Sequence, residues 1–152
     1  MSRALFNTTG DYLHSPVDDL ESFFWVAVWS VFFNKADTGA KSAQEMRMQD
    51  ELYKNNKEVA KDGISLLPGE ANSGATEPFQ FMLIAWGAKV DQRRLEWFVE
   101  VLRRRPDDAK GEYYLPHFHR FALRGVVDVL EVLETFKDDG INSDSWAVTP
   151  PT

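Results

Sequence analysis

The feature that most constrains this chain is a run of apolar side chains that leaves no polar face. Residues 14–34 read HSPVDDLESFFWVAVWSVFFN, and between residues 23 and 33 every side chain except Ser30 is hydrophobic. A helix that is hydrophobic all round must be surrounded by other parts of the protein. The run is too short for a membrane span, which needs about 20 apolar residues. The sequence therefore predicts one central helix that is buried on every side.

The residues before the run carry a strong helix-start signal. Ser15 suits the N-cap, Pro16 suits the first helical position, and Asp18 stands where a carboxylate faces the free amides of the first turn. This signal favours a helix over the rival interpretation, a buried strand. We expect the helix to cover residues 17–33.

Helical patterns also cover most of the remaining chain. Strong helix formers at residues 42–63 predict a surface helix, broken near Asn55 and Asn56. A third helical block begins at Thr76 and ends at the basic residues 103–105, with Gly87 marking a kink or a break. The apolar stripe of its first half consists of Phe79, Met82, Leu83 and Trp86.

The last helical block begins near Leu115, and a short helix is expected from Arg3 to Asn7. No strand is predicted, so the expected fold class is all-α. Residues 140–152 are expected to form a C-terminal tail. Helical spacing places one apolar face of the last block at Phe118, Phe121, Ala122, Val126, Val129, Leu130, Leu133 and Phe136.

Composition narrows the functional classes. The net charge of −7 disfavours nucleic-acid binding, because attraction to phosphates needs a basic surface. The absence of cysteine excludes disulfides, thiolate metal ligands and a cysteine nucleophile. We expect an intracellular protein, cytoplasmic or nuclear, that does not associate with membranes.

Two stretches of the chain carry a resemblance to a known family. HSPVDDLESFFWVAVW resembles the segment that follows the activation loop in the fungal-type protein kinase family, and FHRFALRGVVDVLEVL looks like the closing helix of that family. The opening MSRALF is similar to a segment that stands where other kinases have Ala-Pro-Glu. The resemblance covers residues 1–136, and it is most specific in residues 13–29. Residues 1–139 are therefore identified as part of such a kinase domain.

The resemblance implies a fold and roles for single residues. The apolar run would be the αF helix of the kinase large lobe, the buried axle that carries the catalytic loop, the activation segment and the other helices. Asp19 matches the αF aspartate, whose carboxylate holds backbone amides of the catalytic loop in kinases. Trp25 and Trp29, which share a helix face, are expected to anchor the core. Ala4 stands where the family often has glutamate, so this chain lacks an ion pair made from that position.

The motifs of phosphoryl transfer are missing from the sequence. It contains no Gly-x-Gly-x-x-Gly, no His-Arg-Asp and no Asp-Phe-Gly, although ATP and Mg²⁺ are the cofactors of the complete family domain. A truncated gene, a truncated gene model or an excised fragment would each have such a sequence. We expect no activity and no cofactor for this chain alone. The surface left uncovered is expected to bind a protein partner or a second copy. The alternative function is a non-enzymatic helical interaction module or a pseudokinase remnant.

Several other residues have a functional and a structural interpretation. Asp19 also fits an ordinary carboxylate at a helix N-terminus. His117 and His119 could bind a metal, but two residues apart on a helix they point to different faces. The arginines at 103–105 could bind phosphate or form a solvated helix end. Met46 and Met48 could line a groove or be partly buried.

Overall fold

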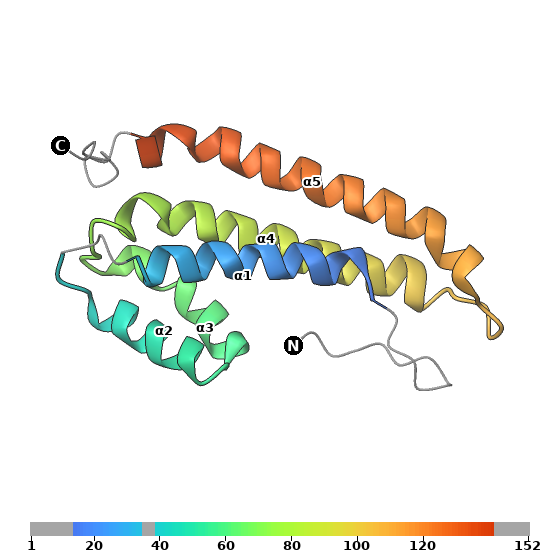
Figure 1. The fold of residues 1–152 in the computed structure, drawn as a ribbon, viewed down its shortest axis with the longest axis horizontal. Helices are drawn as coiled ribbons and strands as arrows, with labels where there is room; N and C mark the ends of the chain where they lie inside the picture. Colours follow the sequence, from blue (N-terminus) through green and yellow to red (C-terminus); the bar gives the residue numbers. More distant parts are fainter. Residues whose placement is uncertain (1–13, 35–38, 142–152) are drawn as a thin grey trace, which may run out of the picture.

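The computed structural model describes residues 14–34 and 39–141, and all regular elements within them are helical (Figure 1). This confirms the predicted all-α class. The short helix expected at Arg3–Asn7 and most of the expected tail lie outside the described residues. The elements are α1 Pro16–Phe32, α2 Ala43–Tyr53, α3 Lys57–Ile64, η1 Leu67–Gly69, η2 Glu77–Phe79, α4 Gln80–Trp97, the π-helical η3 Phe98–Leu102 and α5 Gly111–Ile141.

The three long helices α1, α4 and α5 lie lengthwise beside one another, and each contacts the other two (Figure 1). The chain direction of α4 is opposite to that of α1 and α5. The shorter helices α2 and α3 pack on each other, α2 against α1 and α3 against α4. Helix α4 contacts α1, α3 and α5. The centre of the fold is therefore formed by α1 and α4 together and not by α1 alone, as the prediction of one central helix had it.

Helix α1 begins with the expected capping box. The backbone N–H of Ser15 donates to Asp18 Oδ2 at 2.9 Å, and the backbone N–H of Asp18 donates to Ser15 Oγ at 3.3 Å. Burial on every side was predicted for this helix, and that prediction is wrong. Phe23 and Val26 are 64% and 63% exposed. Among the described residues, neighbouring helices cover only one side of α1, and its uniformly apolar sequence does not reveal which side.

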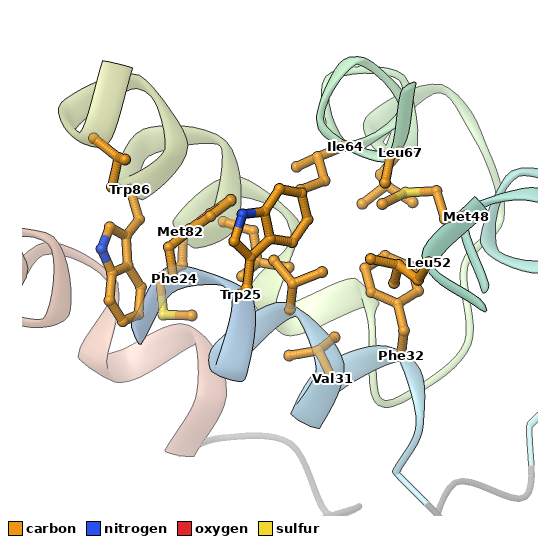
Figure 2. Packing of buried hydrophobic residues seen from close by; sticks show 14 of the residues in the cluster. Phe24, Trp25, Val31, Phe32, Met48, Leu52, Ile64, Leu67, Met82 and Trp86 are labelled. Atoms are coloured by element: carbon orange, nitrogen blue, oxygen red, sulfur yellow. The ribbon is translucent and has the colours of Figure 1, made fainter. Parts of the chain in front are cut away.

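Most of the core gathers around the covered side of α1 (Figure 2). Phe24 is fully buried and meets the Trp25 ring edge-on at a centroid distance of 5.2 Å. A second, smaller cluster joins the start of α1 to η3 and α5. Its buried members are Val17, Trp97, Val101, Leu102 and Phe121.

The break predicted near Asn55 and Asn56 is confirmed, since α2 ends at Tyr53 and α3 begins at Lys57. Asn55 has a φ of 57°, a left-handed conformation that asparagine adopts more readily than most residues. These helices are not merely superficial. They contribute buried side chains to the main core, namely Met48, Leu52, Ala60 and Ile64.

Two glycines allow the long helices to approach closely. Helix α4 runs through Gly87 without interruption, so of the two alternatives, a kink or a break, the break is wrong. A Cβ at Gly87 would stand 3.3 Å from Cζ of Phe24, and one at Gly125 would stand 2.7 Å from Cγ of Leu20. The absent side chains leave the space in which Phe24 and Leu20 of α1 pack. Gly87 and Gly125 therefore identify the sides of α4 and α5 that face α1.

The side of α5 that is buried differs from the apolar face that the sequence predicted for it. Phe121, Gly125, Asp128 and Val132 are buried, whereas Val126, Leu130 and Leu133 are 53%, 60% and 45% exposed. The prediction failed because α5 is apolar over more than half of its circumference, and its buried side includes an aspartate and a glycine. The helix also begins earlier than expected, at Gly111, and contains Pro116.

Candidate functional site

Asp19, which the resemblance matches to the αF aspartate, lies in the first turn of α1 with 53% of its side chain exposed. Its Oδ1 is 2.8 Å from His14 Nε2, and the His14 side chain is 49% exposed. A carboxylate here interacts favourably with the positive end of the helix dipole. Solvent can satisfy the rest of its hydrogen-bonding capacity.

The two tryptophans that were paired in the sequence differ in environment. Trp25 is 4% exposed, and its Nε1–H donates to Glu21 Oε1 at 3.3 Å. Trp29 is 38% exposed and stacks on Phe33 with a centroid distance of 4.2 Å. Trp25 therefore lies in the core as predicted, while the prediction that Trp29 is a core anchor is wrong. Residues four apart share a face only approximately, and the covered surface ends between these two.

Glu45 is a buried carboxylate that the sequence analysis missed. It is 0% exposed and accepts hydrogen bonds from the backbone N–H groups of Ser42 and Ser73, at 2.7 and 2.9 Å. Burial alone would raise the pKa of Glu45, but hydrogen bonds from Ser73 and Thr76 outweigh it, so the pKa lies below its ordinary value. The spacing Ser42-x-x-Glu45 is a capping box and could have revealed the site. Its geometry indicates a structural clamp between the start of α2 and the loop that joins η1 to η2.

A second buried carboxylate, Asp128, joins α4 to α5. Arg93 donates to Asp128 through Nη2 at 2.9 Å and through Nε at 2.5 Å, and Lys89 Nζ lies 3.4 Å away. Desolvation opposes the ionised form, yet these cations hold the pKa of Asp128 below its ordinary value. The same contact raises the pKa of the Arg93 guanidinium. The arrangement is a bidentate ion pair that fixes the two helices relative to each other.

A hollow of about 290 Å³ opens between α3 and α4 beside Phe24 and Gly87. Glu58, Asp62 and Asp91 line it together with a single cation, Lys61, which pairs with Asp91. Three carboxylates against one ammonium group make this hollow negative, which disfavours the phosphates of a nucleotide. The described residues that line it include no histidine, serine–base pair or phosphate-binding glycine loop.

The remaining candidates lie apart from one another in the described residues. His117 is partly buried beside Arg120, His119 is exposed, and the arginines at 103–105 are exposed just after the end of η3. Within residues 14–34 and 39–141, no group of three metal-ligating side chains comes together. Met46 is 56% exposed, whereas Met48 is 1% exposed and belongs to the core instead of lining a groove. In the same described ranges, no helix combines the length and the apolarity needed to cross a membrane.

The most distinctive surface feature is apolar and runs along two neighbouring helices. We call it the α1–α5 face and define it by Phe23, Val26, Leu123, Val126, Leu130 and Leu133, which are 45–68% exposed. Helical spacing puts Phe23 and Val26 on the flank of α1 next to α5, beyond Leu20, and puts Val126 and Leu133 on the flank of α5 next to α1. The contact between Leu20 and Gly125 holds the two flanks side by side.

Comparison with known proteins gives no relative. No protein-family model, no curated protein and no solved structure matches this chain.

Proposed function

We propose that the chain is the helical large-lobe part of a fungal-type protein kinase and that it does not transfer phosphate by itself. The motif HSPVDDLESFFWVAVW suggests the family, and the geometry of α1 supports it. Ser15 caps the helix, Asp19 lies in its first turn, and Trp25 is buried. In the family, these positions belong to the αF helix, which the catalytic loop and the activation segment contact.

The observation that carries the proposal is that α1 is apolar on all sides although one of its sides is exposed. Phe23 and Val26 are apolar and mostly exposed, although nothing in a solvent-facing helix requires such residues. A helix selected for burial on all sides has this composition. The kinase interpretation explains it, because the elements that would cover the second side have no counterpart among the motifs of this sequence.

A non-enzymatic helical interaction module is the second candidate. The α1–α5 face exposes a contiguous apolar surface of the kind found at protein-binding sites, which favours a binding function. The hollow beside Phe24 is negative, which disfavours a nucleotide and so an ATP-dependent enzyme. Under this interpretation the likeness to kinases is a remnant or a convergence, and the chain acts by binding.

A calorimetric titration of the purified chain with Mg-ATP tests the proposed inactivity. We expect no saturable heat into the millimolar range, because the glycine loop, the paired lysine and the metal-binding aspartate of this chemistry are missing from the sequence. Saturable, magnesium-dependent binding would contradict the proposal.

The family assignment needs a separate test. Sequencing the transcript upstream of the Met1 codon should reveal in-frame His-Arg-Asp and Asp-Phe-Gly motifs if the chain belongs to a kinase. Finding neither motif would favour the interaction module.

A further inference from the structure

We draw no further inference here: the strongest candidate, the acid-lined hollow between α3 and α4, already holds the Lys61 ammonium against Asp91, and nothing in the described residues shows that its other carboxylates, Glu58 and Asp62, bind a ligand.

Discussion

Phe23 and Phe24 are neighbours on α1 with the same side chain and opposite surroundings. Phe24 is fully buried, edge-on to Trp25 and to Trp86 at centroid distances of 5.2 and 6.1 Å. Phe23 is 64% exposed. The difference arises in the partner helices, because Gly87 of α4 leaves space for Phe24 and no described element packs over Phe23. The sequence of α1 alone therefore cannot distinguish its two sides.

The same contrast recurs in the ionised groups. Asp128 has 6% of its side chain exposed between α4 and α5, whereas Glu131, one turn further along, has 59% exposed, and Lys89 contacts both. At the start of α1, Asp18 has 14% of its side chain exposed and completes the capping box, and the adjacent Asp19 has 53% exposed. In each pair, one carboxylate is shielded from solvent and its neighbour is mostly exposed.

The largest effect is expected from Phe24→Ala. Removing a fully buried phenylalanine leaves a cavity and should lower the free energy of unfolding by about 3–5 kcal/mol. Phe23→Ala should change it by no more than about 0.5 kcal/mol when the chain is monomeric. Urea denaturation at low protein concentration measures both, and equal losses would mean that α1 is covered on both sides.

Asp128→Asn should come next, with a loss of about 3 kcal/mol, because it leaves Arg93 without its bidentate partner at a part-buried site. Glu131→Gln removes only an exposed contact to Lys89 and should cost less than about 1 kcal/mol. Urea denaturation of both variants at neutral pH makes the comparison, and a similar cost for the two would show that the Arg93 pair is solvated.

The Asp128 pair also has a pH signature. Its pKa in the folded state lies below the ordinary value of 3.8, so the pair contributes stability above about pH 4 and loses it as the pH falls through the folded pKa. The difference in unfolding free energy between the wild type and Asp128→Asn should therefore shrink in acid. A difference that stays constant from neutral pH to pH 3 would contradict this assignment.

Much of the fold follows from the sequence. Capping and breaking residues act through local geometry, and the start of α1 at Pro16 and the break at Asn55 were predicted within a residue or two. The stripe of Met82, Leu83 and Trp86 was also predicted, because α4 has polar residues on its other side that make the periodicity visible. Local signals and a clear polar face are the conditions under which such predictions hold.

The uncovered side of α1 and the rotation of α5 could not be predicted in the same way. Both helices are apolar over too wide an arc for periodicity to choose a side. The decisive contacts are between distant residues, such as Leu20 with Gly125 and Arg93 with Asp128, and a single sequence gives no pairing information. The clamp at Glu45 was missed although its capping-box spacing was present.

The smallest effect is expected from Asp19→Ala, and it bears most directly on the kinase interpretation. Asp18→Ala should cost about 1 kcal/mol, since it removes the carboxylate that accepts from the Ser15 backbone N–H. Asp19→Ala removes only a favourable interaction with the helix dipole and an exposed contact to His14, about 0.5 kcal/mol or less. In a complete kinase the matching aspartate would hold catalytic-loop amides, and its loss would be severe. Thermal and urea unfolding of the two variants at neutral pH measure both costs. A larger loss of stability for Asp19→Ala than for Asp18→Ala would mean that the Asp19 carboxylate already holds backbone amides within the present chain.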